Sequence, residues 1–145
     1  MTLDELIDLE NYQVILNVHQ RTGVGGRPAL IINDRKYQVQ NLTNTLVSIP
    51  YGVEITWALL TSNQISPTSI IKRIVVASIY SNPDSRKKTL LLDQIAETYH
   101  LLSSKYQDGL HFILAGDTND LKLDPILNLS PNLKQVVTFS HVITF

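Results

Sequence analysis

A strand, a long helix and a second strand follow one another along the second half of the chain, and this order constrains the fold more than any other feature. Residues 74–80 (IVVASIY) are rich in β-branched side chains, which predicts a central strand. A helix is predicted from about Arg86 to Lys105, and residues 110–115 predict another buried strand. Because such a unit crosses over, its two strands are expected to lie parallel, with the helix packed on the sheet.

The helix of this unit has a marked start and one apolar face. Asp84 or Ser85 is expected to cap its first turn. Apolar residues recur at the three-to-four spacing that gives a helix a single apolar stripe: Leu91, Ile95, Thr98 and Leu102, joined by Leu92, Ala96 and Tyr99.

The first half of the chain is rich in predicted strands. Residues 12–18 and 28–32 each predict a strand, and the second is of the kind buried on both faces. Asn33-Asp34 then turns the chain into residues 37–40, where we expect a β-hairpin with the preceding strand. Residues 53–60 alternate so that one face carries Val53, Ile55, Trp57 and Leu59.

Two further local features precede or join these strands. Residues 3–9 predict a short surface helix with Thr2 as its N-cap, and glycines in residues 23–26 predict a flexible turn. The 145 residues contain no repeat and no linker, so we expect one mixed α/β domain spanning residues 1–145.

Composition limits the classes of function. A net charge of −1 argues against binding nucleic acid by bulk electrostatics, although a nuclease needs only a local basic rim. Residues that could supply one are Arg21, Arg27, Lys72, Arg73, Arg86, Lys87 and Lys88. No apolar run approaches the roughly 18–20 residues that span a bilayer, and the acidic amino end does not look like a signal peptide, so no membrane partner and an intracellular location are expected.

The candidate site follows the last strand of the crossover unit. Gly116 there is followed by a carboxylate, Asp117, and by an amide two residues later, Asn119. If the extended geometry persists, both side chains point into one cleft beyond the carboxyl end of the strand. The alternative is that one of them only caps a helix beginning at Asp120. Tyr80 is the last residue of the parallel neighbour strand and should emerge at the same edge. The alternative is that Tyr80 is only a core residue with a hydrogen-bonded hydroxyl.

These residues resemble a known superfamily. Residues 79–83 (IYSNP), the helix and residues 113–119 (ILAGDTN) look like the endonuclease/exonuclease/phosphatase superfamily, closest to the endonuclease domain of non-LTR retrotransposons. Residues 25–32 (GGRPALII) resemble that family's glycine-rich turn into a strand, and the similarity spans about residues 12–137. The resemblance implies an α+β fold, a mixed, DNase-I-like β-sandwich flanked by helices, here missing terminal strands.

The resemblance also implies a chemistry. It implies Mg²⁺-dependent hydrolysis of phosphodiesters, with DNA as the partner. Asp117 would orient or deprotonate the attacking water, and Asn119 would form a hydrogen bond with the scissile phosphate or the nucleophile. Tyr80 would donate a hydrogen bond to a phosphate oxygen as charge builds on it.

Parts of the family pattern have no match, which implies an incomplete copy with impaired activity. The family's metal-binding Glu precedes the stretch matching Tyr12, where Glu5 and Glu10 look like solvated surface charges. His141 follows Ser140, not the family's Asp. A binding module that kept the fold but lost catalysis, and a phosphatase of a small metabolite or lipid, therefore stay open as alternatives. An incomplete copy should also expose sheet edges and be marginally stable.

Overall fold

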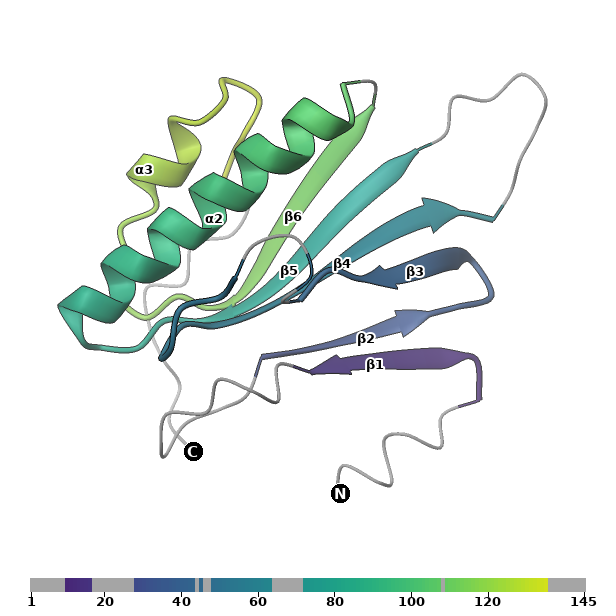
Figure 1. Ribbon diagram of the computed structural model, residues 1–145, viewed down its shortest axis with the longest axis horizontal. Coiled ribbons are helices and arrows are strands. Elements are labelled where there is room, and N and C mark those ends of the chain that lie inside the picture. The colour runs from purple at the N-terminus through teal and green to yellow at the C-terminus, as the bar shows by residue number, and fades with distance from the viewer. Residues whose placement is uncertain are drawn as a thin grey trace.

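The computed structural model describes residues 10–16, 28–43, 45, 48–63, 72–107 and 109–135 (Figure 1). The elements in these ranges are β1 (Tyr12–Leu16), β2 (Ala29–Asn33), β3 (Tyr37–Asn41), β4 (Glu54–Ser62), β5 (Arg73–Tyr80), α2 (Ser85–Lys105), β6 (Leu110–Asp117) and α3 (Asp124–Leu127). The predicted helix at residues 3–9, residues 17–18 of the first predicted strand and the glycine turn at 23–26 lie outside the described residues.

The strands form two sheets. β1 and β2 pair antiparallel, and a second, mixed sheet has the order β3-β4-β5-β6. Within it β3, β4 and β5 are antiparallel neighbours, whereas β5 and β6 are parallel and joined by α2. This confirms the predicted crossover unit and the mixed α+β class with two sheets.

Three layers follow from this topology. α2 packs its buried residues on one face of the large sheet, in a core that includes Ile55, Trp57 and Ile79. The opposite face of the large sheet packs against the small sheet, through Ala58 and Leu60. Figure 1 shows α2 on the side of the large sheet away from β1 and β2. Val53, Ile55, Trp57 and Leu59 all lie in the core beneath α2, as their alternation predicts.

The predicted cap and stripe of α2 are confirmed. Asp84 is the N-cap, and its side chain accepts a hydrogen bond of 2.8 Å from the backbone N–H of Arg86. The buried residues of the helix are Leu91, Gln94, Ile95, Thr98 and Leu102. Gln94 is polar in this stripe, and its amide donates to the Thr98 hydroxyl at 3.2 Å, so the two buried polar groups satisfy each other in part.

The predicted hairpin between the second and third strands is wrong, because β2 and β3 belong to different sheets. The turn between them is hydrogen-bonded to Asn63, just after β4, instead. The Asn63 amide donates to the carbonyls of Asp34 and Arg35, and its backbone N–H donates to the carbonyl of Lys36. These bonds draw β3 onto β4, while the Asp34 N–H donates to the Asn11 carbonyl and extends the pairing of β1 with β2.

Two strands that were predicted to be buried each expose one face. β2 alternates between buried and exposed residues, and Ile31 on its outer face is 48% exposed. β6 contacts the α2 core through Phe112 and Leu114, but Ile113 on its other face is 52% exposed. The small sheet covers residues of β3, β4 and β5 rather than β6, which leaves that face of β6 open. No helix in the described part of the chain is long and apolar enough to span a membrane.

Candidate functional site

Three side chains from adjacent strands form a row across one end of the large sheet. Glu54 of β4 is in register with Tyr80 of β5, and Tyr80 is in register with Asp117 of β6. Ile55 and Ile79 point into the core beneath α2, so the alternation of side chains directs Glu54 and Tyr80 to the opposite face. Asp117 ends β6 in register with Tyr80, so it lies at the same end of the sheet. We call Glu54, Tyr80 and Asp117 the strand-end row.

A hydrogen bond supports this assignment of faces. The Thr56 hydroxyl, two residues along β4 from Glu54, donates at 2.9 Å to the carbonyl of Pro28, just before β2. This bond places the Thr56 side chain toward the small sheet, and Glu54 shares its side by alternation.

The residues of the strand-end row differ in their exposure to solvent, and Glu54 Oε2 is itself buried. Neighbouring strands lie roughly 4.8 Å apart, so the backbones of Glu54 and Asp117 are about 10 Å apart, with Tyr80 on the strand between them. Glu54 and Tyr80 are half-buried, and Asp117 is exposed. Two carboxylates and a phenol therefore line one end of the sheet.

Gly116 makes the last position of this row possible. Its φ is +135°, and a Cβ at this position would lie 2.0 Å from the carbonyl oxygen of Ile79. Only glycine permits so close an approach of the two backbones. β6 therefore continues two residues beyond the predicted Ala115, and the Ser81 N–H donates to the Asp117 carbonyl at 2.8 Å.

Asn119 reaches the site by a turn rather than by extended alternation, so this part of the prediction is wrong. Its φ is +45°, a left-handed conformation that asparagine tolerates better than most residues. Its backbone N–H donates to Asp117 Oδ1 at 3.0 Å, and its Nδ2 donates to the Ser81 carbonyl at 2.6 Å. Asn119 thus ties the loop after β6 to the loop after β5. The alternative of a helix beginning at Asp120 is also wrong, because α3 begins at Asp124.

Two surface carboxylates near this end have shifted pKa values. The backbone N–H of Arg86 lowers the pKa of Asp84, with a further contribution from the Arg86 guanidinium 3.9 Å away. The ammonium group of Lys88 hydrogen-bonds to Asp120 and lowers the pKa of that carboxyl. Lys88 in the first turns of α2 is thus joined to the loop that carries Asn119.

The basic residues predicted for the rim lie at two different ends of the large sheet. Arg86, Lys87 and Lys88 begin α2 and lie at the end of the sheet where β5 finishes. Lys72 and Arg73 lie at the opposite end of β5, so the prediction that they belong to the rim is wrong. The Arg73 guanidinium packs 4.8 Å from the centre of the Tyr106 ring. The other two candidates, Arg21 and Arg27, lie outside the described residues.

Glu54 is the site residue that sequence reasoning missed. The alternation of residues 53–60 already placed it opposite Ile55, but nothing local indicates that Tyr80 and Asp117 become its neighbours. Of the other acidic and histidine candidates, Glu10 is exposed beside β1, as expected, while Glu5 and His141 lie outside the described residues.

The donor chemistry of the row fits a hard cation. Within the described ranges, no three or more histidine, cysteine, aspartate or glutamate side chains group to hold a metal ion. Mg²⁺, however, is commonly bound by one or two carboxylates, with water and substrate phosphate completing its shell. Glu54 and Asp117 are such a pair of oxygen donors.

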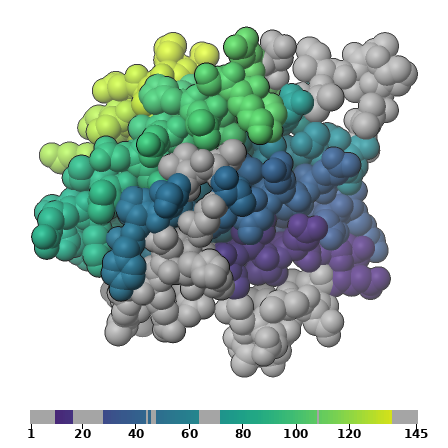
Figure 2. Space-filling model, viewed as in Figure 1, coloured from purple at the N-terminus to yellow at the C-terminus, as the bar shows by residue number. Residues whose placement is uncertain are grey.

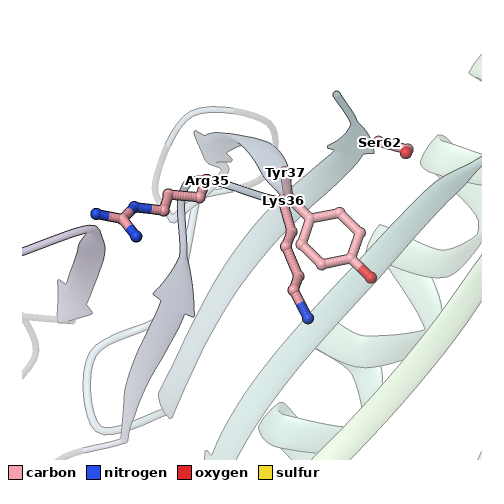
Figure 3. Close-up of a pocket in the computed structure, with 4 residues that line it drawn as sticks. All are labelled: Arg35, Lys36, Tyr37 and Ser62. Atoms are coloured by element: carbon pink, nitrogen blue, oxygen red, sulfur yellow. The ribbon is translucent and has the colours of Figure 1, made fainter. Parts of the chain in front are cut away.

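A separate cavity lies at the other end of the sheet. It has a volume of about 300 Å³ and is lined by Arg35, Lys36, Tyr37 and Ser62. Ser62 ends β4, whereas Glu54 begins it, so the cavity is a strand length away from the row. Figure 3 shows Arg35 directed away from Lys36 and Tyr37, so the two cations do not converge on a common ligand position.

No family model, curated protein or solved structure matches this chain. The residues of the strand-end row, with Asn119, therefore carry the functional inference.

Proposed function

We propose that the chain is a metal-dependent phosphodiester hydrolase domain that acts on DNA, of the endonuclease type found in the endonuclease/exonuclease/phosphatase superfamily. The observation that carries the proposal is the strand-end row: a tyrosine in register with a carboxylate on each neighbouring strand, at the end of the sheet where the parallel strands β5 and β6 have their carboxyl ends. Ligand sites in sheets of this kind gather beyond those strand ends, because the loops there converge.

Asp117, Tyr80 and Asn119 would each have a separate role in the hydrolysis. Asp117 is exposed and accepts a proton from, or orients, the attacking water. The Tyr80 hydroxyl donates to a phosphate oxygen, which carries more negative charge in the transition state than in the substrate. Asn119 has one N–H bonded to the Ser81 carbonyl, which holds its amide beside Asp117 and leaves a second N–H for the phosphate.

Glu54 and Asp117 are the residues that would hold Mg²⁺. Both are carboxylates in register with Tyr80, and oxygen ligands of this kind suit Mg²⁺. When bound, the ion would act as a Lewis acid on the phosphate.

The finer description of the fold, a DNase-I-like sandwich, belongs to the same proposal. It is supported by two sheets packed through Ala58 and Leu60, and by a parallel crossover whose second strand ends in Gly-Asp-x-Asn.

Plasmid nicking tests the proposal. With Mg²⁺ the purified chain should convert supercoiled DNA to the open circle slowly, because the sequence lacks parts of the family pattern, and chelation of the metal should stop the reaction. Asp117→Ala should abolish nicking, while Tyr80→Phe should slow it by roughly 100-fold, the size of effect seen when one transition-state donor is removed. Asp93→Ala is the matched control, because this carboxylate is exposed on α2 away from the row.

Metal binding gives an independent readout. Titration with Mn²⁺, followed by its electron paramagnetic resonance signal, should show one site that Glu54→Gln and Asp117→Asn weaken and Asp93→Asn does not. Nicking that survives Asp117→Ala would refute the assignment. DNA binding that needs no metal and yields no cleavage would favour the binding module instead.

A further inference from the structure

An exposed tyrosine stands on a tight turn just before the strand-end row. The Val53 N–H donates to the Pro50 carbonyl at 3.1 Å and Gly52 has a φ of +87°, which together describe a type II turn with Tyr51 at its first central position. Tyr51 is 77% exposed, while Ile49 and Val53 on either side of the turn are buried in the core at 3% and 1% exposure. The ring is thus held in solvent by two buried anchors.

The position of the turn gives the exposed ring a neighbour. Tyr51 precedes Glu54 by three residues, so its backbone lies within roughly 10 Å of Glu54 and at the end of the sheet that bears Tyr80. Figure 2 shows the segment 48–53, in dark blue-green, at the surface of the molecule. A ligand whose phosphate lies on the strand-end row would therefore have its adjoining parts within reach of the ring.

We propose that Tyr51 stacks on an unpaired nucleobase next to the phosphate held at the strand-end row, so that the preferred ligand is single-stranded or locally unpaired DNA. This inference rests on the proposed function of that row. Every base presents a π-face, so stacking on tyrosine gives affinity without requiring a particular sequence. A chain of net charge −1 cannot obtain that affinity from bulk electrostatics, which makes a stacking contact the suitable means. A small phosphorylated metabolite without an aromatic base has nothing to place on the ring.

Fluorescence anisotropy of a short labelled single strand, with Ca²⁺ in place of Mg²⁺ to prevent cleavage, tests the proposal. Loss of one stacked base weakens binding by about fivefold to 150-fold, so Tyr51→Ala should raise Kd by about tenfold or more. Tyr51→Phe and Tyr51→Trp should bind as the unchanged protein does. Tyr12→Ala is the matched control, because Tyr12 is 44% exposed and pairs with Asn33, at the end of the small sheet away from Pro28 and Thr56.

A strand in which successive bases are replaced by abasic sites isolates the stacking contact. It keeps every phosphate, so the unchanged protein should bind it more weakly than the intact strand, by the factor that Tyr51→Ala costs. Tyr51→Ala itself should no longer distinguish the two strands. Equal binding of the intact strand by Tyr51→Ala and the unchanged protein would overturn the stacking inference alone, provided nicking depends on Asp117. Absence of any DNA binding by the unchanged protein would overturn both this inference and the DNA substrate.

Discussion

Gly116→Ala is the substitution for which the structure makes its sharpest stability prediction. The added Cβ would lie 2.0 Å from the carbonyl oxygen of Ile79 and 2.8 Å from its nitrogen. Both atoms are backbone atoms of β5, so no side-chain rotation can relieve the contact. The end of β6 must move away from β5, and Asp117 moves with it out of register with Tyr80.

The magnitude follows from two contributions. A φ of +135° is a conformation that alanine adopts at a cost of about 1–3 kcal/mol. Separation of the strand ends also breaks the bond from the Ser81 N–H to the Asp117 carbonyl, which contributes about 1 kcal/mol. We therefore expect Gly116→Ala to reduce the free energy of unfolding by about 2–4 kcal/mol, a large part of the roughly 5–15 kcal/mol that stabilises an ordinary domain.

Urea unfolding followed by circular dichroism measures this loss. With a slope of about 2 kcal/mol per M urea, the midpoint should fall by about 1–2 M. Gly109→Ala is the control, because Gly109 also has a positive φ, +75°, at the other end of β6. If Gly116→Ala costs no more than Gly109→Ala, the close approach of the two strands is not what Gly116 provides, and the reasoning fails.

Three smaller predictions concern the loops at the same end. Asn119→Ala should lower the free energy of unfolding in urea by about 1–2 kcal/mol, because it removes the hydrogen bond to the Ser81 carbonyl and disfavours a φ of +45°. Asn119→Gly should recover the part of this loss that is due to φ. Equal losses for the two variants would contradict this account. Asp84 and Asp120 both have a pKa below the unfolded value of 3.8. Each carboxylate therefore stabilises the fold at pH values above 3.8, and this contribution is lost as the pH falls through the folded pKa. The melting temperature of Asp84→Asn, which still caps α2 but does not titrate, should therefore fall less below pH 3.8 than that of the unchanged protein. A double-mutant cycle of Lys88→Met with Asp120→Asn should show coupling at neutral pH and none at pH values well below 3.8, and coupling that persists in acid would refute the ion pair.

The strand-end row shows how far sequence reasoning reached at the site. Tyr80 and Asp117 could be placed at one edge because a strand–helix–strand crossover joins parallel strands, whose carboxyl ends meet at the same edge of the sheet. The conformation of Asn119 could not be predicted, because it depends on a bond to the Ser81 carbonyl, 38 residues earlier in the chain. Glu54 was missed because its role depends on which strand lies beside β4.

The sequence by itself determined the elements whose information is local: the buried face of β4, the capped start and apolar stripe of α2, and the order of strands around that helix. These features are local because side-chain periodicity repeats within one element, whatever surrounds it. The tertiary structure alone decided that β3 pairs with β4 rather than with β2, and that the small sheet leaves one face of β6 open. Strand partners depend on hydrogen bonds between distant segments, such as those from Asn63 to the turn after β2, and no local pattern encodes them.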